Sequence, residues 1–278
     1  MSTENALLTI LVEKINNDTL VLPTLPAIAL KVRKAADDPE INLNAMAEVI
    51  GQDPSLSARI IKISNSAYLG RTVKVESLSQ AVTRIGLTQI KNIATALAME
   101  QLFVSKNEVV KGYINKIWDR TVEVVAHSLA LYNVYQKEKK DRTMNVDTLT
   151  LCALVHNIGI LPILTEAERH EEVFANPTFL NVAVQKLSGR IGGAITSEWG
   201  FGQDFVQVAE SWKNMKVQTD KVSYLDFVRM GAATAGYVSN QKDAILNLCM
   251  KKNMLSDLAI IESDEFKEAK DAAKAIFN

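Results

Sequence analysis

The stretch from Gly51 to Met99, GQDPSLSARIIKISNSAYLGRTVKVESLSQAVTRIGLTQIKNIATALAM, carries the start and stop signals of three short helices. Asp53-Pro54 fits a helix start, because Asp accepts hydrogen bonds from free backbone N–H groups and Pro suits the first helical position. The segment Ser77–Gln80 has the pattern of a capping box, and Gly86 can end the helix that follows it. Thr88 can cap the third helix, whose apolar residues recur at helical spacing.

The rest of the chain shows similar helical spacing. Pro26 and Asn42 fit the starts of two helices, and few helix breakers occur from Glu108 to Glu138, which predicts one long helix. Asp147 can cap the apolar helix Leu149–Val155. Other helices are predicted near residues 7–15, 165–174, 178–187, 190–199, 203–212, 222–241, 243–252 and 263–277. These patterns predict an all-α, multi-helix fold.

Composition limits the classes of partner. The chain has 278 residues, 47% of them hydrophobic, which is enough for a sizeable core. Lys and Arg number 31 against 32 Asp and Glu, so no overall positive charge attracts nucleic acid, and we expect none to bind. Cys152 and Cys249 are the only cysteines, as is common in a reducing cytoplasm. No apolar run approaches the roughly 20 residues that span a bilayer, so we expect a cytoplasmic protein without membrane contact.

Five short motifs occur in a fixed order along the chain. They are Leu22-Pro23-Thr24-Leu25-Pro26, Asp53-Pro54-Ser55-Leu56, Asn65-Ser66-Ala67, Ala81-Val82 with Ile85-Gly86, and Leu154-Val155-His156-Asn157-Ile158-Gly159. In this order they resemble the HDOD family, the HD-related output domain of bacterial signalling proteins. The resemblance implies an all-α HD-like bundle with a regulatory role. It divides the chain into an N-terminal helix (1–19), an HDOD domain (20–215, with a bundle over 20–105 and an HD-like part over 106–215) and a C-terminal helical extension packed on it (216–278).

The HDOD family is related to the HD phosphohydrolases, whose His and Asp side chains hold a divalent metal ion that activates water. By this resemblance His156 corresponds to the histidine of the His-Asp pair. Its neighbour Asn157, at the position of the aspartate, is neutral and a poor metal ligand. Arg120 stands near the place of an earlier metal-binding histidine, where its guanidinium would supply the positive charge of the lost ion. We therefore expect a degenerate site, with no catalytic residue and no bound metal.

A polar cluster at a predicted helix exit is a second candidate site. Asn65, Ser66 and Tyr68 suit two roles there: capping the helix end, or presenting polar groups to a partner or ligand. Arg59 and Lys62 on the preceding helix form a local basic zone. Such a zone is either a solvated face or a contact for an acidic protein segment or a phosphate-bearing ligand.

Three functions are compatible with these features. The first is a non-catalytic signal-transduction module that acts through contacts with signalling proteins, which follows from the resemblance. The alternative is a metal-dependent phosphohydrolase, a phosphodiesterase acting on a nucleotide or cyclic dinucleotide with a divalent metal as cofactor. The third is a nucleotide or nucleic-acid sensor, which the near-zero net charge disfavours. The sequence leaves the partner, the upstream signal and the oligomeric state open.

Overall fold

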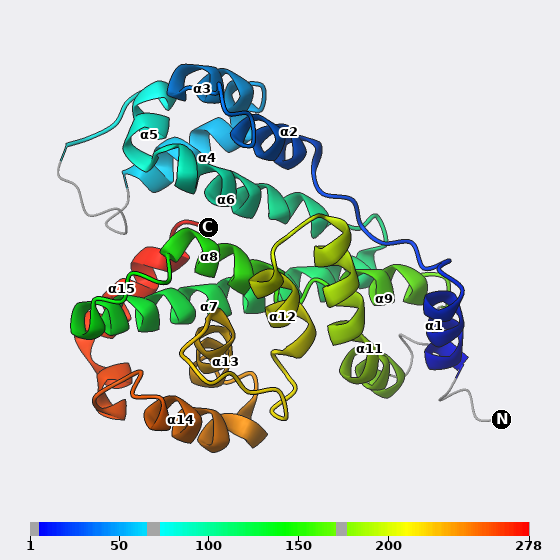
Figure 1. Ribbon diagram of the computed structural model, residues 1–278. Helices are drawn as coiled ribbons and strands as arrows, with labels where there is room; N and C mark the ends of the chain where they lie inside the picture. Colours follow the sequence, from blue (N-terminus) through cyan, green and yellow to red (C-terminus); the bar gives the residue numbers. More distant parts are fainter. Residues whose placement is uncertain (1–5, 66–72, 171–176, 278) are drawn as a thin grey trace. The chain divides into compact units, whose positions relative to one another are not determined.

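The computed structural model describes residues 6–65, 73–170 and 177–277, which form helices and no strands (Figure 1). This confirms the predicted all-α fold. In chain order the helices are α1 (Ala6–Asn16), α2 (Ala27–Ala36), α3 (Leu43–Gly51), α4 (Pro54–Ser64), α5 (Leu78–Ile85), α6 (Leu87–Ala98), η3 (Met99–Leu102), α7 (Glu108–Lys139), α8 (Val146–Val155), α9 (Ile160–Ala167), α11 (Pro177–Glu198), α12 (Gln203–Ser211), α13 (Tyr224–Thr234), η4 (Ser239–Gln241), α14 (Lys242–Lys251), η5 (Leu258–Glu262) and α15 (Asp264–Lys274).

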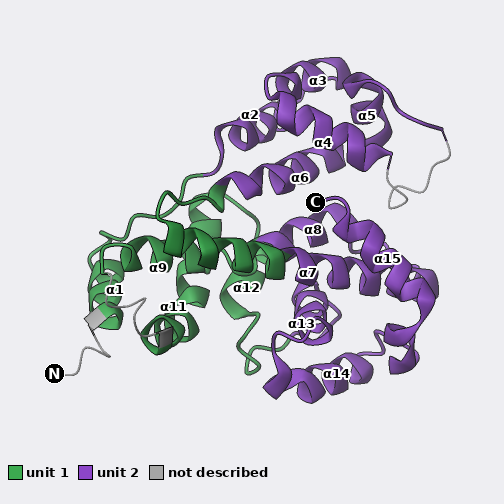
Figure 2. Ribbon diagram, turned by 180° about the vertical axis from the view of Figure 1, so that it is seen from behind, with its two compact units in different colours: residues 1–24, 102–121, 155–218 green, residues 25–101, 122–154, 219–278 purple. Residues whose placement is uncertain are grey.

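Two compact units make up the chain, and each consists of three separate segments (Figure 2). The first unit comprises residues 1–24, 102–121 and 155–218. The second comprises residues 25–101, 122–154 and 219–278. The contiguous domain boundaries given by the resemblance, after residues 19, 105 and 215, stay a prediction.

In the second unit, helices α2 to α6 begin mostly where their capping residues predict. Asp53 Oδ1 accepts a hydrogen bond from the backbone N–H of Leu56 at 3.0 Å, and Pro54 is the first residue of α4. Ser77 and Gln80 form the predicted capping box of α5. Pro26 and Asn42 precede α2 and α3 as expected. The apolar stripes of these helices face inward, since Ile50, Ile60, Val82 and Ile90 are fully buried.

Two predicted caps are wrong. Helix α6 begins at Leu87, before Thr88, because Gly86 has φ +87° and reverses the chain directly after α5. Helix α8 begins at Val146, and Asn145 Oδ1 rather than Asp147 accepts the hydrogen bond from Thr148 N–H at 3.0 Å. Asp147 is buried and instead accepts a hydrogen bond from Asn92 Nδ2 at 2.8 Å, so a contact far along the sequence determines its role.

In the first unit, α1, α9, α11 and α12 pack together. The long helix α11 differs from the prediction. The sequence suggested two helices, near 178–187 and 190–199, whereas α11 continues through Gly189. A Cβ on Gly189 would overlap the backbone carbonyl of Glu210, and one on Gly192 would lie 3.2 Å from that of Ala209. These glycines therefore allow α11 and α12 to approach closely, and this packing compensates for their low helix propensity.

The expectation that no apolar run approaches the length of a membrane span is wrong for the stretch Val146–Ala167. It has 22 residues, its most apolar 18-residue window has a mean hydropathy of 1.7, and by length and composition alone it could cross a membrane. The chain divides this stretch into α8 and α9, and 83% of its most apolar window is buried within the protein. Burial of this kind is also typical of a core segment.

Candidate functional site

A tight turn at residues 156–159 joins α8 to α9, and its residues lie in the first unit. Ile158 N–H donates to the carbonyl of Val155 at 3.0 Å, and Ile160 N–H donates to the carbonyl of Asn157 at 3.1 Å. A Cβ on Gly159 would lie 2.5 Å from the backbone nitrogen of Gly192 and would overlap the carbonyl oxygen of Ser188. The backbone of α11 therefore lies directly against the turn, so position 159 accepts only glycine without displacement.

His156 points into the interior of this unit. It is 3% exposed, and its ring packs edge-on against that of Trp212, with 4.7 Å between centroids and 82° between planes. Edge-to-face packing of this kind is typical of aromatic groups in a core. His156 is therefore a buried histidine directly after the end of α8.

Two other polar groups belong to this region: Lys213, which lies on the Trp212 ring, and Asn157, which follows His156 in the sequence. The Lys213 ammonium lies 4.7 Å from the centroid of the Trp212 ring, and burial lowers the pKa of Lys213 to about 8. Asn157 Oδ1 is buried and accepts no hydrogen bond from the residues that the structure describes. The turn thus combines a buried imidazole with an amide oxygen that lacks a donor.

These residues do not fit a hydrolytic metal ion. Such an ion needs several imidazole or carboxylate ligands that converge on one point. Within residues 6–65, 73–170 and 177–277, no three side chains of His, Cys, Asp or Glu come close enough to hold an ion. The neutral amide of Asn157 is a weak ligand, and an ammonium group on Trp212 would repel a cation.

Arg120 is exposed on α7, whereas His156 is buried. The proposed replacement of an ion by the Arg120 guanidinium would require a desolvated position beside the histidine. The exposure of Arg120 gives no support to that replacement, and its role stays a prediction.

The polar helix exit after α4, in the second unit, is organised by Asn65. The Asn65 side chain donates through Nδ2 to the carbonyl of Val75 and accepts through Oδ1 from the N–H of Val75, both at 2.7 Å. Arg84 adds a hydrogen bond from Nη1 to the carbonyl of Ser64 at 3.0 Å. Both polar atoms of Asn65 thus hold the chain together at this exit, which favours the structural role over partner contact. Ser66 and Tyr68 lie outside the described residues.

The two basic residues of this candidate site differ in environment. Arg59 Nη1 donates to the carbonyl of Leu97 at 2.9 Å and to Glu100 Oε2 at 2.5 Å, so it links α4 to the end of α6 and to η3. Lys62 is exposed. Because Glu100 already neutralises Arg59, the predicted basic zone is weaker than the sequence suggested.

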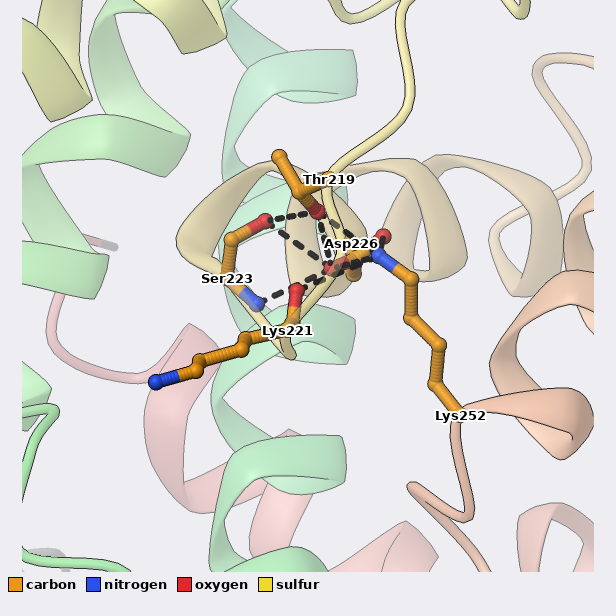
Figure 3. A network of polar contacts seen from close by, with 5 residues as sticks. All are labelled: Thr219, Lys221, Ser223, Asp226 and Lys252. Atoms are coloured by element: carbon orange, nitrogen blue, oxygen red, sulfur yellow. Dashed lines mark hydrogen bonds and ion pairs between the residues drawn. The ribbon is translucent and has the colours of Figure 1, made fainter.

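One polar cluster was not predicted from the sequence. It is the buried network around Asp226 in the second unit (Figure 3). Lys252 Nζ, just after α14, donates to both carboxylate oxygens of Asp226 at 2.8 Å and to Thr219 Oγ1 at 2.7 Å. Asp226 Oδ2 also accepts from the backbone N–H and the hydroxyl of Ser223, each at 2.9 Å. The pattern Ser223-x-x-Asp226 is a capping box that the sequence could have revealed, whereas nothing local predicts Lys252.

Comparison with known proteins agrees with the fold. Residues 22–215 match the model of the HDOD domain. A crystal structure from Shewanella amazonensis SB2B, named "putative metal-dependent phosphohydrolase", is 42% identical and covers 100% of both chains with a TM-score of 0.94. An HDOD domain protein from Geobacter sulfurreducens is 15% identical and covers 99% of both chains with a TM-score of 0.59, which is a similarity of fold.

A longer relative is also similar in sequence. An uncharacterized protein of Treponema pallidum (strain Nichols) is 23% identical over an alignment of 205 residues, which covers 70% of this chain. The chain spans only 38% of the length of that protein.

Proposed function

Because the chain belongs to the HDOD domain family, we propose that it is a non-catalytic signal-transduction module that acts through contacts with other proteins. The observation that carries this proposal is the environment of the His156 turn. There the histidine packs on Trp212, and its neighbour Asn157 is an amide with an unused acceptor. The described residues thus lack the ligand set that phosphate-ester hydrolysis at a divalent ion requires.

The alternative is a metal-dependent phosphohydrolase, and one observation favours it. The Shewanella amazonensis relative carries that activity in its name and is 42% identical over the whole chain. Under this alternative His156 would bind the ion. The two proposals therefore differ in a measurable property, the metal content of the protein.

The experiment compares wild-type protein with a His156→Gln variant. Both are purified, loaded with Mn²⁺, desalted and analysed for metal by mass spectrometry, and both are assayed with bis(p-nitrophenyl) phosphate and with a cyclic dinucleotide. We expect much less than one equivalent of metal in either protein and the same background hydrolysis. A stoichiometric ion that His156→Gln loses, together with loss of hydrolysis, would establish the phosphohydrolase.

A second arm tests the signalling role directly. A chromosomal deletion in the native host is complemented with wild-type protein or with the Asn157→Ala variant, and the transcriptional response to the deletion is recorded. Because the proposal assigns no chemistry to the turn, Asn157→Ala should restore the wild-type response at equal protein abundance. If the stably folded variant fails to restore it while wild-type succeeds, the turn itself is functional and the proposal is wrong.

A further inference from the structure

A groove of about 500 Å³ lies in the first unit between α11 and α1 with the segment that follows α1. Its walls include the apolar residues Ile15, Leu22 and Ile191 and the small residue Ala194. Arg190 and Glu198 also line it. A concave site of this size is within the range of ligand-binding pockets, and its lining combines apolar with charged side chains.

The charges of the groove are available for a ligand. Lys14, which also lines it, is already paired with the buried Glu166, with 2.7 Å between Nζ and Oε2. In contrast, Asp18, Arg190 and Glu198 are exposed, and none of them forms an ion pair with another described residue. A complementary ligand therefore carries a negative group for Arg190 and a positive group for the carboxylates.

The spacing of these charges along α11 indicates the length of the ligand. Arg190 and Glu198 are eight positions apart in one continuous helix, which is about 12 Å at 1.5 Å per residue. An extended chain advances about 3.3–3.6 Å per residue, so about four residues of peptide cover this distance. The apolar side chains of such a segment would lie on Ile191 and beside Ala194.

The wall opposite α11 is held in place before any ligand binds. The backbone N–H groups of Thr19 and Leu20 donate to the carbonyl of Lys14 at 2.9 and 3.2 Å and close the end of α1. Trp199 Nε1 donates to the carbonyl of Pro23 at 2.9 Å and fixes the far end of the same segment. A preformed groove needs little ordering on binding, which favours a short ligand.

We propose that this groove binds a short extended peptide segment of a partner protein, with an acidic residue at Arg190, a basic residue at Glu198 and apolar residues between them. The inference rests on the proposed function, because it identifies one surface through which a protein-binding module acts. Helix α1 lies outside residues 22–215 that match the HDOD model, as do four of the nine residues that line the groove.

The test titrates the blocked peptide acetyl-Glu-Leu-Ala-Lys-amide into ¹⁵N-labelled full-length protein and follows backbone amide shifts. We expect saturable shifts confined to residues 14–23 and 190–199. The Ala194→Trp variant fills the groove and should weaken binding at least tenfold, whereas Gln185→Trp, on an exposed part of α11 outside the groove, should bind like wild-type. Equal melting temperatures of the three proteins would exclude unfolding as the cause.

A charge reversal tests the recognition itself. The Arg190→Glu variant should prefer acetyl-Lys-Leu-Ala-Lys-amide over the first peptide by at least tenfold, while wild-type protein shows the opposite order. Absent or non-saturable shifts, shifts outside the groove, or an unchanged order of the peptides would overturn the proposal. So would self-association of the wild-type protein that Ala194→Trp abolishes in sedimentation, because a second copy would then occupy the groove. None of these outcomes alters the metal and hydrolysis measurements, so the two proposals fail separately.

Discussion

The ammonium of Lys252 lies 2.8 Å from both carboxylate oxygens of Asp226, and Asp226 is only 1% exposed. This pair connects the end of α14 to the start of α13, 26 positions apart in the sequence. Two charges taken out of water are tolerated only when each finds a counter-charge and hydrogen bonds, and here Thr219 and Ser223 supply those hydrogen bonds. The pair therefore makes the packing of α13 against α14 specific.

Lys252→Ala is expected to lower the free energy of unfolding by about 1.5–3 kcal/mol, because it removes the ammonium that donates to both oxygens of the buried Asp226 carboxylate, while the buried Arg229 still attracts that carboxylate. Urea unfolding monitored by circular dichroism measures this change. Lys251→Ala, one residue earlier and exposed, should change stability by less than about 0.5 kcal/mol. A loss no larger than that of Lys251→Ala would show that the ion pair does not stabilise this packing.

Asn65→Ala is expected to cost about 1–3 kcal/mol of stability, because it removes two side-chain hydrogen bonds to the backbone of the buried Val75. The matched control is Lys74→Ala, an exposed neighbour of Val75, which should be nearly neutral. Chemical denaturation of both variants provides the comparison. If Asn65→Ala were as stable as Lys74→Ala, Asn65 would not organise this exit, and partner contact would become the better explanation.

Gly159→Ala and Gly112→Ala are expected to act in opposite directions. A methyl group at position 159 meets backbone atoms of Ser188 and Gly192, so the variant should lose about 3 kcal/mol. A methyl group at position 112, in the exposed part of α7, meets nothing within 4 Å and should stabilise the helix by about 0.5–1 kcal/mol. The two melting temperatures test this, and a loss of equal size at both positions would contradict the close approach of α11 to the turn.

His127 is expected to make stability dependent on pH. Burial lowers its pKa to about 4, against opposing effects of Glu123 and Asp271 that raise it. Lys270 and Lys274 lower it further.

The Nδ1 atom of His127 lies 2.9 Å from Thr234 Oγ1. Since that hydroxyl donates to the carbonyl of Met230 at 2.9 Å, it accepts from His127, which makes Nδ1 the protonated nitrogen of the neutral ring.

The pKa of His127 is thus lower in the folded protein than its ordinary value of about 6.5 in the unfolded chain. Between pH 6.5 and 4 the unfolded chain binds more protons, so the stability that is fully present above pH 6.5 falls as the pH is lowered through this range. The slope from one group is at most about 1.4 kcal/mol per pH unit. A His127→Gln variant should show a flatter dependence in urea unfolding at pH 7, 6 and 5, and an unchanged slope would contradict a lowered pKa.

Many helix starts follow from local sequence patterns alone. Asp53 and Leu56, or Ser77 and Gln80, lie within one helical turn, so the hydrogen bonds that they form depend on neighbouring residues alone. The ordered motifs also identified the family correctly. The predicted cap at Thr88 is wrong, because Gly86, with its positive φ, lies between α5 and α6 and α6 begins directly after it.

The roles of most of these polar residues depend on contacts between distant parts of the chain. The sequence drew attention to Asn65, but its role depends on Val75, ten positions away. It placed His156 at a helix end, yet Trp212 determines the environment of that ring. The Asp226–Lys252 pair and the groove between α1 and α11 join residues that are remote in the chain. Local sequence patterns reflect interactions within a single helical turn. Burial and charge pairing, in contrast, arise only when distant segments of the chain meet.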